Sequence, residues 1–211
     1  MGIVSLGMAE LVTDMQMEHV KSVVEVHLQS FRGFFLSFLG RNFLSELYRG
    51  ILTDPSGIAL VAVADERITG FVAGTEAPAG FYKRLLRKRW WRFAWASLPA
   101  IIKKPSACLR IFRALSMPKQ VTTEKGRGTL MSIAVLPGEQ SQGIGQRLVA
   151  AFLEEAAKRG LQQMDLTTDK CNNASVNAFY LQQGFSCVHS FVTPEGREMN
   201  EYRIDLPVNR I

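Results

Sequence analysis

The stretch from Gln140 to Gly145, which reads QSQGIG, has the composition and the position of an anion-binding loop. It follows a short apolar run, Leu130–Leu136, that is typical of a buried strand. From Ile144 the apolar residues recur every three or four positions up to Gly160, which indicates an amphipathic helix with a glycine at its end. Backbone N–H groups at a helix N-terminus attract anions, and glycine lets a ligand approach the backbone closely. The sequence therefore predicts a phosphate or pyrophosphate site at this junction.

The glycine spacing excludes two common phosphate-binding loops. No Gly-Lys-Ser/Thr follows, so the loop is not a P-loop, and the third glycine of the dinucleotide-binding G-x-G-x-x-G is absent. The pattern Gln140-x-x-Gly143-x-Gly145 instead resembles motif A of the GNAT acyl-CoA N-acetyltransferases. A second match lies downstream, where NxxVxxFYxxxGF, from Asn173 to Phe185, resembles that family's motif B. The two motifs stand in the family's order, about one βαβ unit apart.

This resemblance implies the GNAT fold, a mixed and mostly antiparallel α/β sheet with helices on both faces, and acetyl-CoA as co-substrate. In that family two parallel neighbouring strands splay apart, and the pantetheine arm enters the gap beside one strand edge. The resemblance assigns that edge to the backbone of Ile133, Ala134 and Val135. It assigns the pyrophosphate to the loop of motif A, which comprises Gln140, Ser141, Gln142, Gly143, Ile144 and Gly145.

Motif B supplies the candidate catalytic acid. Tyr180 matches the tyrosine that protonates the departing CoA thiolate in this family. The alternative interpretation of Tyr180 is a half-buried aromatic residue on an amphipathic helix. Asn173 is expected to cap the same helix and to contact the cofactor.

The base that deprotonates the amine is left open by the sequence. Many relatives carry a glutamate on the fourth strand, where this chain has Ser132. Glu76, at the end of the expected third strand, is one candidate; Asp165 and a chain of water molecules are the others. The sequence has no Ser-His-Asp or Cys-His arrangement, which favours direct attack in a ternary complex over a covalent acyl-enzyme. His19 and His27 have no metal-ligand partner nearby in the sequence, and no metal site is expected.

The remaining pattern predicts the element order β-α-α-β-β-insertion-β-α-β-α-β-β. The two helices before the first hairpin are expected at 15–30 and 34–53. In acyltransferases of this shape their connection forms one wall of the acceptor pocket, which makes Phe31, Arg32 and Phe34 candidate substrate contacts. Core packing is the alternative for this phenylalanine-rich segment.

Length and composition are those of one globular domain, residues 1–211, with a basic helical insertion at 77–123. The insertion contains eleven of the 25 Lys and Arg residues, no Asp or Glu, and all three tryptophans. Breaks are expected at Pro99 and Pro105. The three cysteines lack C-x-x-C spacing, and no signal peptide or membrane span is apparent, which favours a reducing cytoplasm.

Three interpretations of the insertion remain open: a helical lid with a solvated basic face, a cover for an anionic acceptor, and a membrane contact. No motif for reading nucleic acid accompanies it. The segment HLQSFRGFFLSFLG with the basic insertion also resembles GNAT proteins of bacterial surface-polysaccharide clusters, which acetylate amino sugars on nucleotide carriers. The predicted function is therefore acetyl transfer to a small amine by a monomer or homodimer. The alternative is an acyl-CoA-binding module at a membrane surface or protein partner that performs no turnover.

Overall fold

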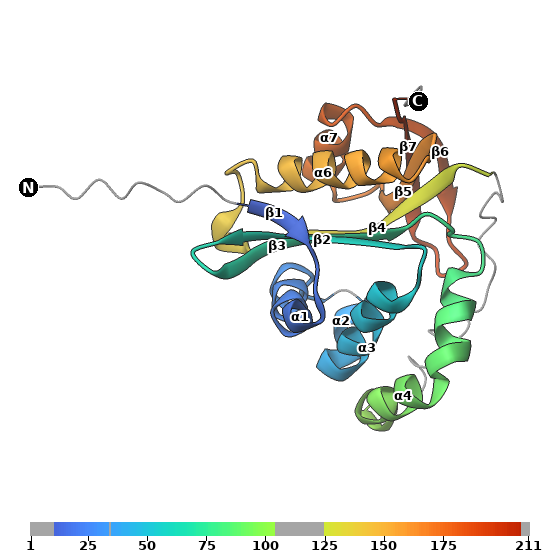
Figure 1. Cartoon of the computed structure of the whole chain (residues 1–211). Helices are drawn as coiled ribbons and strands as arrows, with labels where there is room; N and C mark the ends of the chain where they lie inside the picture. Colours follow the sequence, from blue (N-terminus) through green and yellow to red (C-terminus); the bar gives the residue numbers. More distant parts are fainter. Residues whose placement is uncertain (1–10, 34, 104–124, 208–211) are drawn as a thin grey trace, which may run out of the picture.

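Seven strands form one sheet in the order β1-β2-β3-β4-β5-β7-β6 (Figure 1). The structure is a computed structural model, and it describes residues 11–33, 35–103 and 125–207. The strands are β1 (Leu11–Asp14), β2 (Gly57–Ala64), β3 (Arg67–Thr75), β4 (Arg127–Val135), β5 (Gln163–Asp169), β6 (Ser186–Val192) and β7 (Glu198–Asp205). Among these seven described strands only β4 and β5 pair in parallel, so the predicted mixed and mostly antiparallel sheet is confirmed.

Helices cover both faces of the sheet (Figure 1). One face carries η1 (Met17–His19), α1 (Val20–Ser30), α2 (Phe35–Phe38), α3 (Gly40–Thr53) and α4 (Phe81–Lys103). The other carries α6 (Ile144–Lys158) and α7 (Ala174–Gln182), and a short η2 (Pro137–Glu139) precedes α6. The expected single helix at 34–53 is divided, because Gly40 adopts a left-handed φ of 85° where α3 begins.

Each face of the sheet has its own hydrophobic core. Leu148, Phe152 and Ala156 recur every four residues along α6 and are fully buried against one face. On the other face Leu44 and Tyr48 of α3 pack with Phe71 of β3.

The insertion between β3 and β4 begins with α4, which differs from its prediction. The helix runs through Pro99 and bends instead at Arg89, whose φ of −135° and ψ of 19° are non-helical. The Arg89 side chain is held by α3, where it reaches Glu46 and Thr53. The expected break at Pro105 lies outside the described residues.

A gap opens between β4 and β5. The two strands pair only from Arg127 to Thr129 and from Gln163 to Asp165. Beyond that point β5 pairs along its length with β7, whereas β4 stays with β3 and has a bulge at Met131. The splay implied by the family resemblance is therefore present, and among the described residues it leaves one edge of β4 without a strand neighbour on the β5 side.

Candidate active site

The N-terminus of α6 follows the C-terminal end of β4, where β4 and β5 have separated. Gly143 is the N-cap residue of this 15-residue helix, and its φ of 77° is one that side chains rarely adopt. Ser141 is also left-handed, with a φ of 69°. The first backbone N–H groups of α6 have no partner within the helix, which is what the predicted anion site requires.

Arg147 is a cation at this site that sequence reasoning missed. Its Nη1 donates to the carbonyl oxygen of Gln142 at 3.2 Å, so its guanidinium lies over the first turn of α6. Its position four residues after Gly143 is the signal that would have placed it there, because residues four apart share a helix face.

Gly145 brings the two motifs together. A β-carbon at Gly145 would lie 3.4 Å from Cζ of Phe179 and 3.9 Å from a methyl group of Val135. Motif A, the end of β4 and the motif B helix α7 therefore converge at one point. The absence of a side chain at Gly145 is what allows α7 to come this close to α6.

The ladder between β3 and β4 identifies which backbone groups of β4 face the gap. The N–H of Leu136 bonds to the carbonyl of Thr69, and the register pairs Phe71 with Ala134 and Val72 with Ile133. Because hydrogen-bonded pairs alternate in an antiparallel ladder, Ala134 bonds to β3 while the backbone groups of Ile133 and Val135 point toward the gap.

The carbonyl of Val135 already has intramolecular partners. It accepts hydrogen bonds from Ser30 Oγ at 3.0 Å and from Gln140 Nε2 at 3.4 Å. The contact with Ser30 fixes the end of α1 beside the end of β4. Phe31, which follows Ser30, is half-buried and Arg32 is exposed, whereas Phe34 lies outside the described residues.

Tyr180 lies one residue beyond Phe179 on α7. Its ring packs against Phe179, Phe185 and Tyr202 at centroid distances of 5.3–5.9 Å. Only 6 % of the residue is exposed, and burial raises the pKa of the Tyr180 hydroxyl to about 12. The phenol therefore keeps its proton at neutral pH, as a general acid must before it acts.

Asn173 is the N-cap residue of α7, but its side chain does not cap the helix. Its Nδ2 instead donates to Thr168 Oγ1 at 2.8 Å and to the carbonyl of Asp169 at 3.1 Å. The expected side-chain cap is therefore wrong, because a cap requires the side-chain oxygen to accept from the first helical turn. The amide of Asn173 fastens α7 to the end of β5.

Asp165 lies where the gap begins. Its carboxylate accepts a hydrogen bond from Thr129 Oγ1 on the neighbouring strand. Its strand neighbours Met164 and Leu166 are buried in the core under α6, so Asp165 faces the opposite side of the sheet. Burial raises the pKa of Asp165, and nearby Glu201 acts in the same direction, against the hydrogen bond from Thr129 and the charges of Arg127 and Arg203.

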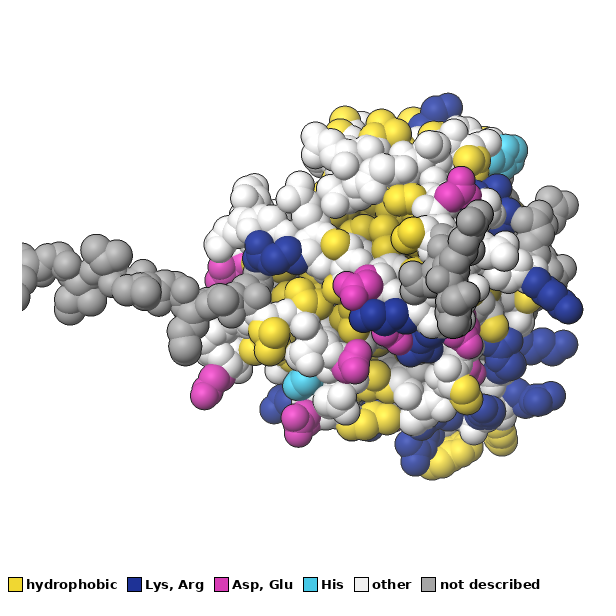
Figure 2. Space-filling model, turned by 45° about the horizontal axis from the view of Figure 1, so that its top comes forward, with side chains coloured by type: hydrophobic (Ala, Val, Ile, Leu, Met, Phe, Trp, Pro, Cys, Tyr) yellow, Lys and Arg dark blue, Asp and Glu magenta, His cyan; other side chains and the backbone are white. Residues whose placement is uncertain are grey.

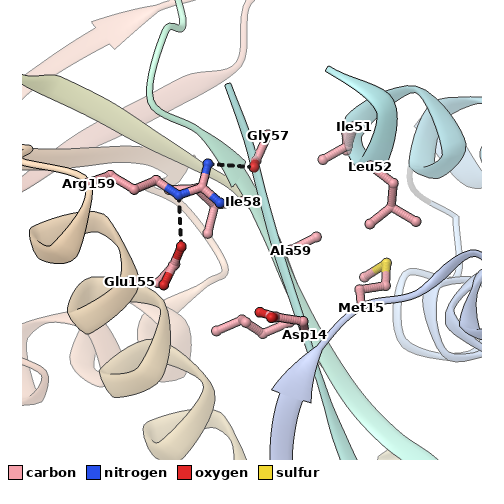
Figure 3. Close-up of a pocket in the computed structure, with 10 residues that line it drawn as sticks. Asp14, Met15, Ile51, Leu52, Gly57, Ile58, Ala59, Glu155 and Arg159 are labelled. Atoms are coloured by element: carbon pink, nitrogen blue, oxygen red, sulfur yellow. Dashed lines mark hydrogen bonds and ion pairs between the residues drawn. The ribbon is translucent and has the colours of Figure 1, made fainter. Parts of the chain in front are cut away.

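Glu76 is not brought to the motif A loop. It follows Thr75, which pairs with Thr129 at the start of β4, whereas the loop follows Val135 at the other end. Its carboxylate lies 3.7 Å from Arg159, near the C-terminus of α6. Figure 3 shows Arg159 beside a cavity of about 180 Å³, between Glu155 and the carbonyl of Gly57. Because α6 is about 22 Å long, this cavity is remote from the predicted anion site.

A buried polar chain under the sheet is the second feature that sequence reasoning missed. His27 Nδ1 lies 2.7 Å from the Tyr48 hydroxyl, which is also hydrogen-bonded to Ser132 on β4. His27 is 3 % exposed, and burial lowers its pKa to about 4. His27 follows Val20, Val23 and Val24 at the spacing of one buried helix face. That spacing was the sequence signal that could have predicted the burial of His27.

Comparison with known proteins identifies the class of this protein. A family model described as "Acetyltransferase (GNAT) family" matches residues 21–185. The chain belongs to that family, and membership implies an acetyl-CoA-dependent acetyltransferase. A search of curated proteins finds no match.

Solved structures show the same fold at low sequence identity. A protein described as an acetyltransferase of the GNAT family from Desulfovibrio desulfuricans is 17 % identical, with a TM-score of 0.65 over 94 % of this chain and 100 % of its own. Salmonella typhimurium yncA, solved with acetyl-CoA, is 13 % identical, with a TM-score of 0.60 over 97 % and 98 %. The paia N-acetyltransferase of Thermoplasma acidophilum, solved with coenzyme A, is 13 % identical, with a TM-score of 0.55 over 93 % and 100 %.

Proposed function

We propose that this protein transfers an acetyl group from acetyl-CoA to the primary amine of a small molecule. The observation that carries the proposal is the convergence of three features at one place: the gap between β4 and β5, the N-terminus of α6, and the helix that bears Tyr180. In a nucleotide thioester, the pyrophosphate would match the N-terminus of α6, the extended arm would match the gap, and the thioester would lie toward the helix that bears Tyr180.

The cofactor would lie along the free edge of β4. Its pyrophosphate would be bound by the N–H groups from Gln142 to Gly145, with Arg147 adding positive charge. The pantetheine amides would pair with the outward backbone groups of Ile133 and Val135, and the bond from Gln140 to Val135 would yield to the incoming arm. The two neighbours solved with CoA or acetyl-CoA support this ligand class.

The reaction needs one group that accepts a proton and one that donates a proton. The neutral amine attacks the thioester carbonyl carbon, the carbon–sulfur bond breaks, and the amide keeps the acetyl group. The nitrogen loses one further proton as the amide forms, and this proton replaces the one that the acid gives to the sulfur. We assign removal of the ammonium proton to Asp165, whose raised pKa makes it a better base than an ordinary aspartate. We assign protonation of the CoA sulfur to Tyr180.

The acceptor would approach from the face of the sheet that carries Asp165. The end of α1, with Phe31 and Arg32, borders that face beside β4. Among small amines we favour an amino sugar on a nucleotide carrier. The likeness of the segment from His27 to Gly40 to amino-sugar acetyltransferases supports this choice, and so do Arg127 and Arg203, which lie near Asp165.

The test is to incubate the purified protein with acetyl-CoA and a panel of amines, and to measure released thiol. We expect amine-dependent thiol release well above the rate without amine. An amino sugar should be compared with and without its nucleoside diphosphate, and the carrier-linked form should have the lower KM. Tight acetyl-CoA binding in calorimetry with no thiol release for any amine would instead support a binding module.

A further inference from the structure

The outward face of α4 is a surface that the proposed reaction does not use. The inward face is firmly docked: Phe81, Leu85, Phe93 and Ala96 are buried, and the Phe93 ring lies 5.1 Å from that of Phe43 on α3. A β-carbon at Gly50 of α3 would overlap Leu85. The described part of α4 is thus held in a defined orientation, and its outward side chains form a defined surface.

Part of the positive charge of α4 is neutralised inside the protein. Arg84 donates to the carbonyls of Ala77 and Ala79 at 2.9 and 2.7 Å and lies 3.7 Å from Asp54. Arg89 and Arg92 lie 3.2 and 3.7 Å from the half-buried Glu46 of α3. These three arginines hold the helix in place, so self-repulsion within the insertion is relieved by acids from other segments.

The rest of the charge faces outward. Lys83, Arg87 and Lys88 are exposed, and none of them forms an ion pair with another described residue. The insertion contains no Asp or Glu that could neutralise them locally. Figure 2 shows Lys and Arg side chains gathered at the lower right of the molecule, the side on which α4 lies, with hydrophobic side chains beside them.

Beyond the bend at Arg89 the same helix presents tryptophans to the outside. Trp90, Trp91 and Trp95 are 67 %, 52 % and 72 % exposed, and Arg92 lies 5.0 Å from the Trp91 ring centroid. These are the only tryptophans in the chain. Clustered exposure of large apolar side chains marks an interaction surface, whereas isolated exposure does not.

We propose that α4 docks this protein on an anionic membrane surface. Lys83, Arg87 and Lys88 would contact lipid phosphates, and the three tryptophans would sit at the level of the headgroups, which is where amphipathic indole rings accumulate. A second copy of the chain fits this face poorly, because it would bring like charges together. Within the described residues no helix has the length and apolar character to span a bilayer. The proposed contact is made by surface side chains of α4, and it is independent of the proposed acetyl transfer.

The tryptophan emission of the full chain tests this directly, because every tryptophan lies on the proposed surface. Vesicles of phosphatidylcholine with about 30 % phosphatidylglycerol should shift the emission to shorter wavelength and sediment with the protein, more strongly at low salt. Pure phosphatidylcholine vesicles should bind far less. The triple variant Lys83→Gln/Arg87→Gln/Lys88→Gln should partition about a hundredfold more weakly, or roughly fivefold per charge.

Two control variants separate docking from general effects of charge and apolarity. Lys21→Gln/Arg67→Gln/Lys170→Gln removes three exposed charges elsewhere and should bind like wild type, apart from a small nonspecific loss. Trp90→Ser/Trp95→Ser should weaken vesicle binding about tenfold, whereas Val188→Ser/Val192→Ser on β6 should not. Absence of vesicle binding by wild type at low salt, or equal losses in the two triple variants, would overturn the proposal. A blue shift that depends on protein concentration without vesicles would assign the face to a second copy instead.

Discussion

Thr129 donates a hydrogen bond to Asp165 at the last register position where β4 and β5 are paired. On one side of this contact the strands form a parallel ladder, and on the other they separate. The Asp165 carboxylate thus lies at the closed end of the gap, on the face opposite α6. A base at this place could reach an amine that approaches a thioester carbonyl held within the gap.

The first prediction concerns Asp165→Asn. Asparagine retains an oxygen that accepts the Thr129 hydrogen bond but cannot take up a proton. If Asp165 is the general base, kcat should fall by roughly 10²–10⁴ while acetyl-CoA affinity stays unchanged. Glu76→Gln is the matched control, and it should keep most of kcat, because Glu76 is paired with Arg159 beside the end of α6, whereas Asp165 lies on the opposite face of the sheet. If Glu76→Gln lowered kcat strongly and Asp165→Asn did not, Glu76 would be the base instead.

Tyr180→Phe tests the proposed acid. The hydroxyl of Tyr180 has no hydrogen bond to another described residue, so its removal should cost little stability. Loss of the acid should lower kcat by roughly 10²–10⁴ with cofactor binding retained. Tyr202→Phe is the control, because the Tyr202 hydroxyl bonds to Asn177 at 2.7 Å and should affect stability rather than kcat. A wild-type kcat in Tyr180→Phe would mean that solvent protonates the thiolate.

Gly143→Val tests the anion site. Valine is strained at a φ of 77°, so the substitution should reorient the N–H groups at the start of α6. We expect acetyl-CoA affinity in calorimetry to fall by about 1–3 kcal/mol, comparable to losing charge-assisted hydrogen bonds. Gly138→Val in the same connection is the control, since a β-carbon there meets nothing within 4 Å. Gly145→Val is a less clean test because the side chain would also push against Phe179. Equal affinities for Gly143→Val and Gly138→Val in folded protein would contradict the assignment.

The sequence predicted the features that depend on local pattern. The strand before Gln140, the helix after Gly143 and the second motif around Tyr180 all have short-range signatures of period and spacing. The fold followed from their order together with the family resemblance that the two motifs carry. Gly160, which was predicted to end the helix after Gly143, follows the C-cap residue Arg159 with a left-handed φ of 80°.

Contacts between distant segments could not be predicted in this way. The counter-charge for Arg89 is Glu46, 43 residues earlier, and the partner of His27 is Tyr48, 21 residues later. No local pattern encodes such pairs, because they exist only once α1, α3 and α4 have packed. The predicted side-chain cap at Asn173 was wrong for a related reason. The residue stands at the cap position, but Thr168 and Asp169 compete for its side chain.

The last prediction concerns acid stability and rests on His27. The folded pKa of about 4 lies below the ordinary value of 6.5, so the unfolded chain binds a proton first as the pH falls. Stability should therefore decline between about pH 6.5 and pH 4, by at most about 3 kcal/mol from this group. His27→Gln keeps a partner for Tyr48 but cannot titrate. It should be less stable at pH 7, yet its free energy of unfolding in urea should change less between pH 7 and pH 4.5. His189→Gln, at an exposed position on β6, should retain the wild-type slope. If His27→Gln and wild type lost stability in parallel, the acid sensitivity would have to come from carboxylates instead.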